Sequence, residues 1–212
     1  MFLLSDELKF PPASKADREG LLAIGGDLNL ERLMLAYRSG IFPWFIEDGV
    51  IYWFSPPKRF VLFCTEIKIG RTMKRVLKSK KFSVTQDTAF DAVIRSCAQV
   101  HIATKGSTWI DDEFISAYNK MHETGHAHSI EVWHGEKLAG GMYGIAVGKI
   151  FCGESMFSAE SNASKVALIH LCTNRKYDVI DCQVYSGHMK TMGARLIPRE
   201  EFLALVSKNG GN

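Results

Sequence analysis

Hydrophobic and polar positions in the middle and C-terminal parts of the chain predict a sheet of consecutive strands. Short apolar segments follow one another, and the turn sequences "HGEK" and "GK" separate three of them. Strands are therefore expected over 82–86, 127–135, 137–147, 149–158, 178–184 and 194–198.

Between these strands the apolar residues recur at helical spacing. Acidic residues at 111–113 favour a helix start there, and Ser158 or Ser161 can cap a helix that begins near Asn162. Helices are expected over 69–80, 88–99, 111–124, 162–174, 187–193 and 199–207. The fold class is therefore α+β, with helices around a central mixed sheet.

The first sixty residues have a different pattern, rich in turns. "PPAS" and "GGDLN" interrupt the apolar positions, and one helix is expected from Asp27 or Asn29 to about Ser39, ended by Gly40. Aromatic residues then lie between prolines in "GIFPWF" and "YWFSPP". We expect a small N-terminal domain over 1–62 and a larger domain over 63–212.

Composition narrows the functional classes. The 212 residues are 46% hydrophobic with a net charge of +3, so any nucleic-acid binding must depend on a local patch. No run approaches the roughly 18 apolar residues of a membrane helix, and the start lacks a secretory pattern, so we expect a cytoplasmic protein without a membrane partner. Five cysteines without a CxxC spacing favour reduced thiols.

Two motifs suggest chemistry that their surroundings disfavour. "HETGH" matches a zinc-protease pattern, which needs both histidines on one continuous helix, but Gly125 falls where the helix should end. We therefore expect no metal site. Cys152 and Cys182 lie in apolar strand-like segments, where a thiol is usually an inert packing group.

The segment "RTMKRVLKSKK" predicts a basic helix face. Spacing of i, i+3, i+4 and i+7 places four cations on one side of the helix, and two lysines follow; no acidic residue interrupts them. A solvated surface is the ordinary interpretation, whereas such a cluster in a nearly neutral chain favours a phosphate backbone. The cations are Arg71, Lys74, Arg75, Lys78, Lys80 and Lys81.

Three polar residues in strand-like segments are candidates for a shared cleft. Asp181 and Gln183 alternate with apolar neighbours and should point to one face of the sheet, and Glu154 lies in another apolar strand. A buried polar network is the alternative interpretation. Trp44, Trp53 and Trp109 lie in segments that look like loops, where their rings could stack on unpaired bases, although single tryptophans are more often core residues.

Together the motifs resemble a known family, the leucyl/phenylalanyl-tRNA–protein transferases. The similarity covers about residues 20–200 in the same order, through "GLLAIGGDL", "YRSGIFPWF", "WFSPPKRFVL", "TWI", "GHAHSIEVW", "GGMYG", "FCGESMFS", "NASK" and "IDCQV". It implies a GNAT-like acyltransferase domain after the small N-terminal domain. It also implies transfer of leucine or phenylalanine, with methionine as a further candidate, from aminoacyl-tRNA to proteins that begin with Arg or Lys, which marks them for N-degron proteolysis.

The resemblance also implies roles for particular residues. Trp44 and Trp109 match the aromatics that hold the terminal adenosine of the tRNA. The side-chain pocket is matched by Met142, Phe151 and Met156, and the polar active-site residues by Glu154, Asp181 and Gln183. The basic segment 71–81 corresponds to the part that meets the acceptor stem.

The chemistry of aminolysis is consistent with these residues. An aminoacyl ester is already activated and an α-amine is partly neutral near its pKa of roughly 7.7–8.0, so no cofactor is expected. Glu154 is expected to attract the cationic N-terminal residue, and Gln183, oriented by Asp181, to accept a hydrogen bond from the amine. Asp181 or a ribose hydroxyl would take the proton. We expect a monomer.

Three alternatives are weaker. An acetyl-CoA-dependent N-acetyltransferase needs a glycine-rich turn at a helix start, and "SAESNASK" has no glycine. A non-catalytic RNA-binding module leaves the three polar residues without a role. A peptidoglycan aminoacyl transferase differs only in its acceptor.

Overall fold

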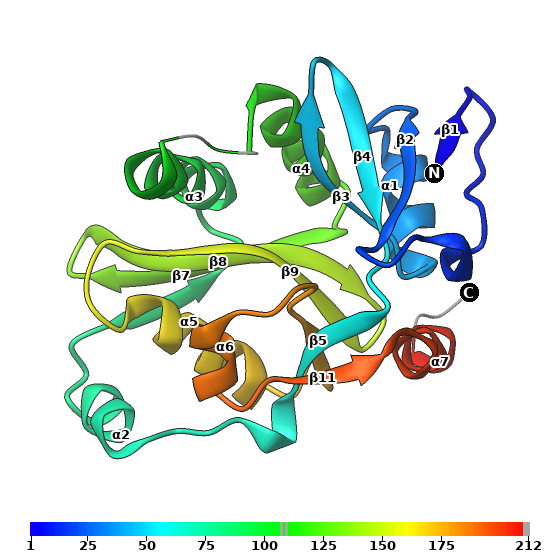
Figure 1. Ribbon diagram of the computed structural model, residues 1–212. Helices are drawn as coiled ribbons and strands as arrows, with labels where there is room; N and C mark the ends of the chain where they lie inside the picture. The colour runs from blue at the N-terminus through cyan, green and yellow to red at the C-terminus, as the bar shows by residue number, and fades with distance from the viewer. Residues whose placement is uncertain (107, 109, 210–212) are drawn as a thin grey trace.

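The chain folds into two β-sheets with helices around them, as a computed structural model shows for residues 1–106, 108 and 110–209 (Figure 1). The smaller sheet has the strand order β1-β2-β4-β3, and helix α1 (Leu30–Arg38) packs beside it. Its strands are β1 (Phe2–Leu4), β2 (Leu21–Gly25), β3 (Phe42–Glu47) and β4 (Val50–Phe54), and the short helix η1 (Ala13–Lys15) lies between the first two.

The larger sheet has seven strands in the order β11-β5-β10-β9-β8-β7-β6. Only β9 and β10 run parallel to each other; every other neighbouring pair is antiparallel. The strands are β5 (Lys58–Phe63), β6 (Ser83–Gln86), β7 (Ala127–His134), β8 (Lys137–Val147), β9 (Ile150–Ser158), β10 (Val179–Asp181) and β11 (Arg195–Pro198). The predicted mixed α/β class with a central mixed sheet is confirmed.

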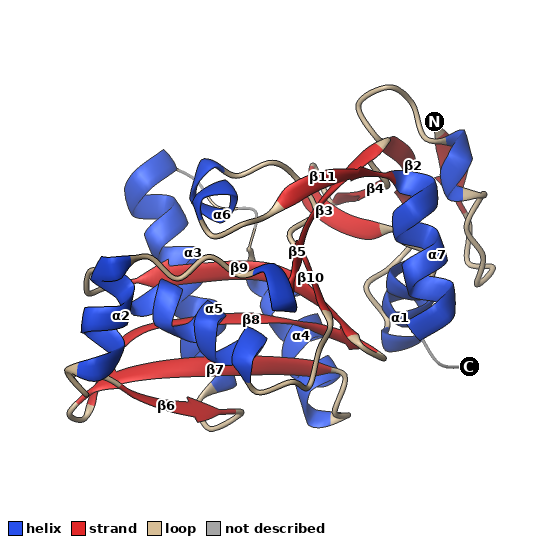
Figure 2. Cartoon of the chain, turned by 90° about the horizontal axis from the view of Figure 1, so that it is seen from below, coloured by secondary structure: helices blue, strands red, loops and turns tan. Residues whose placement is uncertain are grey.

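Helices cover both faces of the larger sheet. In Figures 1 and 2, α3 (Phe90–Lys105) and α4 (Asp112–Glu123) lie on one face, and α5 (Ala163–Thr173), α2 (Arg71–Lys78) and α6 (Gly187–Thr191) on the other. Helix α5 approaches β8 closely because Gly140 has no side chain: a Cβ there would lie 2.6 Å from the Ala163 Cβ. A short helix, η2 (Cys64–Glu66), follows β5.

The N-terminal part and the larger sheet share one hydrophobic core. A single cluster of buried residues extends from α1 and β4 to α3 and α4. The C-terminal helix α7 (Arg199–Asn209) returns to the N-terminal part, where the Arg199 guanidinium donates to the Ala13 carbonyl. The chain enters the larger sheet at Lys58, somewhat before the expected boundary after residue 62.

Local structure differs from the sequence prediction in three places. The N-terminal strands were not predicted, because they are three to six residues long and irregular pairing interrupts both β2–β4 and β3–β4. Helix α3 reaches Lys105, beyond the expected end at residue 99, and Gly106 ends it in a left-handed conformation. The predicted strand 178–184 stops at Asp181.

No helix in the described part of the chain is long and apolar enough to cross a membrane.

Candidate active site

A cavity of about 410 Å³ opens where β9 and β10 separate. The two strands pair only over Val179–Asp181 and Ile150–Cys152, and β9 then continues to Ser158. Within the described residues, no other strand pairs with this side of β9 beyond Cys152. The cavity is lined by Val100, Met142, Gly153, Glu154, Ser155, Met156, Phe157, Ser158, Ser164, Ile180, Asp181, Cys182, Ser186, His188 and Met189. Its volume lies in the range of small-molecule sites, roughly 300–1,000 Å³.

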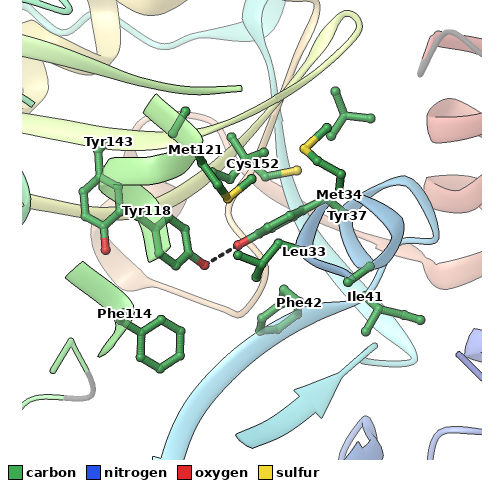
Figure 3. Close-up of a cluster of buried hydrophobic side chains, with 14 of the residues drawn as sticks. Leu33, Met34, Tyr37, Ile41, Phe42, Phe114, Tyr118, Met121, Tyr143 and Cys152 are labelled. Atoms are coloured by element: carbon green, nitrogen blue, oxygen red, sulfur yellow. Dashed lines mark hydrogen bonds between the residues drawn. The ribbon is translucent and has the colours of Figure 1, made fainter. Parts of the chain in front are cut away.

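Glu154 lines this cavity as a buried carboxylate that accepts three hydrogen bonds. The Tyr37 hydroxyl donates to Oε1 (2.8 Å), the Tyr118 hydroxyl to Oε2 (3.2 Å) and the Gln183 side-chain amide to Oε1 (2.7 Å). The two tyrosines come from α1 and α4, and their hydroxyl oxygens lie 2.5 Å apart, pointing toward each other in Figure 3. Glu154 therefore depends on helices from both parts of the chain.

Burial changes the acid–base properties of this group. The pKa of Glu154 is raised from its ordinary value to about 7, chiefly because burial penalises the charged form. Hydrogen bonds from Tyr37 and Tyr118 oppose this rise, and the nearby charge of Asp181 adds to it. Burial also raises the pKa of both tyrosines well above the ordinary value, so the tyrosines stay neutral donors.

Asp181 forms a buried ion pair with Arg59. Its two carboxylate oxygens accept from Arg59 Nε (2.8 Å) and a terminal guanidinium nitrogen (2.7 Å), and neither side chain is more than 2% exposed. The guanidinium also donates to the Gly40 carbonyl and lies between the rings of Phe42 and Phe202, 4.6 and 4.5 Å from their centroids. This arrangement joins β5, the N-terminal part and α7 at the edge of the site.

Gln183 lies in the site, but its backbone conformation differs from the predicted strand. Its backbone has a positive φ of 60°, beyond the end of β10, so it does not share a strand face with Asp181. Its backbone N–H donates to Asp181 Oδ1 (2.9 Å), and its side-chain amide turns to Glu154 instead. The predicted alternation is wrong, but the three polar residues do lie together.

The apolar candidates divide into two groups. Met142 and Met156 line the cavity from paired positions of β8 and β9. Phe151 does not line it: this ring is fully buried against Tyr177, 5.1 Å between centroids, in the core between the sheet and α5. The structure thus places two of the three predicted pocket residues at the cavity.

Trp44 and Trp53 lie on strands rather than in loops. Trp53 is on β4, fully buried, and its indole N–H donates to the Gly25 carbonyl (2.7 Å), so the prediction of an exposed stacking platform is wrong there. Trp44 is half-buried on β3 and packs edge-on against Phe54, and it is not among the residues that line the cavity. Trp109 lies outside the described residues.

The basic helix is present, and its charges face solvent. We call Arg71, Lys74, Arg75 and Lys78 of α2 the basic face; all four side chains are exposed, while Met73 packs inward. The helix ends before Lys80, which has a positive φ, and Lys81 pairs with Glu160 at 2.7 Å. The lysines after the helix therefore do not simply extend the basic face.

The two disfavoured motifs are structural. Helix α4 ends at Glu123 and Gly125 has a φ of 78°, so His126 leaves the helix, while His122 stacks on Phe90. Among the described residues no group of three or more His, Cys, Asp or Glu side chains could hold a metal ion. Burial raises the pKa of the Cys152 thiol well above its ordinary value, consistent with a packing role.

Sequence reasoning missed the residues that hold the site in place: Tyr37, Tyr118 and Arg59. The tyrosines lie inside amphipathic helices, where an aromatic residue is an ordinary core residue, and no local pattern singles them out. The one available signal was Arg59, a cation directly before the apolar run "FVLF", because a charge in a buried strand needs a partner.

The cavity has a buried carboxylate and an apolar wall, and the Gln183 amide contacts that carboxylate. Such groups can position a free amine and take up its proton, which is chemistry that an acyltransferase uses. Comparison with known proteins makes this specific. A family model described as leucyl/phenylalanyl-tRNA protein transferase matches residues 61–207, and a model of that family's N-terminal domain matches residues 26–57. The chain belongs to this family.

Curated relatives agree over nearly the whole length. The leucyl/phenylalanyl-tRNA–protein transferase of Syntrophobacter fumaroxidans is 52% identical, covering 99% of this chain and 91% of the relative. That of Flavobacterium johnsoniae is 50% identical, covering 97% and 99%. Among solved structures, FemX is similar with a TM-score of 0.49 and 10% identity, covering 83% of this chain and 70% of that chain.

Proposed function

We propose that this protein transfers leucine or phenylalanine from aminoacyl-tRNA to the N-terminal Arg or Lys of acceptor proteins, forming a peptide bond. Family membership over almost the entire chain carries the proposal. The cavity beside β9 supports it, because two methionines on one wall suit an apolar amino-acid side chain and a carboxylate suits a cationic acceptor. The product would be marked for N-degron proteolysis.

In this proposal Glu154 attracts the cationic N-terminal residue toward the cavity. Gln183 helps to place the amine: its amide N–H donates to Glu154, which leaves the amide carbonyl to accept a hydrogen bond from the substrate. Asp181 positions Gln183 through the backbone N–H. Trp44 and Trp109 would contact the terminal adenosine, and Phe151 would support the pocket from behind.

The basic face would bind the tRNA acceptor stem. It is exposed, rich in cations and free of acidic residues within α2, which favours contacts with phosphates rather than with bases. Lys80 and Lys81 would contribute less, since Lys81 already pairs with Glu160. We further propose a GNAT-like larger domain over 63–212, a monomeric state and a cytoplasmic location.

An acetyl-CoA-dependent enzyme is not favoured. A pyrophosphate would need free backbone N–H groups at the start of α5. There the Ser164 N–H donates to the Ser158 hydroxyl (3.0 Å) and the Ala163 N–H to the Glu160 carbonyl (3.1 Å).

The proposal is tested with purified protein, leucyl-tRNA carrying labelled leucine, and peptides that begin with Arg, Lys, Asp or Ala. We expect label on the Arg and Lys peptides only. Equal labelling of all four peptides, or none of any, would contradict the acceptor assignment. Stabilisation by acetyl-CoA in a thermal-shift assay would instead support the N-acetyltransferase.

A further inference from the structure

The groups around Asp181 make it an unsuitable proton acceptor. Both of its oxygens accept hydrogen bonds from Arg59, and Oδ1 also accepts from the Gln183 backbone. The side chain is 0% exposed. A proton bound by Asp181 would have to displace one of these donors, and it would leave the buried Arg59 guanidinium without its counter-ion.

Glu154 has the opposite surroundings. It lines the cavity at 9% exposure, and no cation is paired with it among the described residues. Its partners are neutral: two tyrosine hydroxyls and one amide. Gaining a proton would therefore cost a hydrogen-bond rearrangement but would leave no opposite charge uncompensated.

Helix positions fix this carboxylate from two sides. Tyr37 lies on α1 in the N-terminal part and Tyr118 on α4 above the larger sheet, and both are almost completely buried. Figure 3 shows the two rings converging from separate elements. The hydroxyls also contact each other at 2.5 Å, so neither can rotate away from Glu154 without breaking two contacts.

We infer that Glu154 is the general base of the aminolysis, held in place by Tyr37 and Tyr118 as positioning residues. This inference rests on the proposed function. The amine nitrogen of the acceptor forms the new C–N bond to the ester carbonyl carbon, and its proton moves to Glu154. The C–O bond to the terminal ribose then breaks, and the proton passes from Glu154 to the ribose oxygen, which restores the carboxylate.

The ionisable groups around Glu154 set the expected pH dependence. The titratable and charged groups that act on Glu154 are Tyr37 (α1), Arg59 (β5), Tyr118 (α4), Tyr143 (β8), Cys152 (β9) and Asp181 (β10). His188 of α6 lines the same cavity, and burial lowers its pKa. From α3, His101 contacts the Ser155 hydroxyl at 3.4 Å. The pKa of Glu154 near 7 places half-ionisation within the range in which the enzyme can be assayed.

Tyrosine variants provide the test. In wild type, kcat/KM for leucine transfer to an Arg peptide, which reports groups of the free enzyme, should rise with pH through a single-proton limb centred at about 7. Tyr37→Phe and Tyr118→Phe each remove a hydrogen bond that stabilises the charged carboxylate. The limb should therefore move up by about one pH unit, with the rate recovering at high pH.

Tyr143→Phe is the matched control. Tyr143 is also fully buried and packs edge-on against Tyr118, but its hydroxyl has no hydrogen-bond partner among the described residues. This variant should leave the limb in place. Glu154→Gln should remove the limb and lower kcat by about 10²–10⁴-fold, with leucyl-tRNA affinity in filter binding within about threefold of wild type.

The outcomes distinguish a wrong assignment of Glu154 from a wrong proposed function. A limb that stays at the same pH in Tyr37→Phe and Tyr118→Phe, both shown to be folded by circular dichroism, belongs to the substrate amine and overturns the assignment of Glu154. A limb that persists in Glu154→Gln does the same. Wild-type protein that labels no Arg peptide at any pH contradicts the proposed function instead.

Discussion

The buried Arg59–Asp181 pair allows a quantitative prediction about stability. Asp181→Asn keeps the shape of the side chain but removes its charge, leaving Arg59, which is 2% exposed, without a counter-ion. Breaking a buried pair in this way typically costs about 3–5 kcal/mol. The Gly40 carbonyl and the rings of Phe42 and Phe202 still face the cation, which places the expected loss near the lower limit, about 3 kcal/mol.

Thermal unfolding followed by circular dichroism measures this effect. For a chain of this size, about 3 kcal/mol corresponds to a Tm lowered by about 6–12 °C. Asp91→Asn is the matched control, because the same change is made in a pair with Arg95 whose side chains are about half exposed. Such pairs contribute less than about 1 kcal/mol, so its Tm should fall by less than about 4 °C.

A double variant completes the cycle. Arg59→Met combined with Asp181→Asn leaves neither charge buried, so it should lose less stability than the sum of the two single variants. If Asp181→Asn unfolds at the same temperature as Asp91→Asn, or if the double variant is simply additive, the pair does not hold this region as the geometry indicates.

Three further predictions concern binding, selectivity and reactivity. Changing Lys74, Arg75 and Lys78 to glutamine should weaken tRNA binding equally for different tRNA sequences and reduce the slope of log K against log salt by about 2–3; an unchanged slope would mean that these side chains are simply solvated. Met156→Ala should change the ratio of leucine to phenylalanine transfer in a competition assay by about tenfold, because it enlarges the cavity wall, and an unaltered ratio would place the amino-acid pocket elsewhere. Iodoacetamide at pH 8 should leave Cys152 unlabelled in the native protein while labelling it in urea, since burial raises the pKa of this thiol; rapid native labelling, read by mass spectrometry, would contradict its packing role.

Local signals in the sequence predicted much of the larger domain. Glycine and acidic residues determine where α4 begins and ends, and apolar segments separated by the turns "HGEK" and "GK" predicted the three central strands. These features depend on residues close together in the chain. The N-terminal sheet escaped prediction because its strands are short and irregular, and two of its three strand pairs, β1–β2 and β2–β4, join residues far apart in sequence. The third pair, the β3–β4 hairpin, is local, and its Asp48-Gly49 turn was a signal that the sequence offered.

The sequence predicted the three polar residues of the candidate site, but not their geometry or the residues that hold them in place. Glu154, Asp181 and Gln183 could be identified because polar side chains in apolar strands are unusual. Gln183 has a positive φ, which few non-glycine residues adopt and which no sequence signal announces. The sequence therefore could not predict that the Gln183 backbone would contact Asp181 while its side chain contacts Glu154. The contact between Tyr37 and Tyr118, 81 positions apart, depends wholly on tertiary packing.

The guanidinium held between Phe42 and Phe202 has a consequence for biosynthesis. The two rings that cover Arg59 are far apart in the sequence, so Phe42 is synthesised well before Phe202. In a ribosome-bound chain that still lacks α7, the Arg59 guanidinium is therefore without the Phe202 ring that packs against it in the folded protein. Contacts of such long sequence separation form slowly. We expect nascent chains to be inactive until α7 has emerged from the exit tunnel and packed against Arg59.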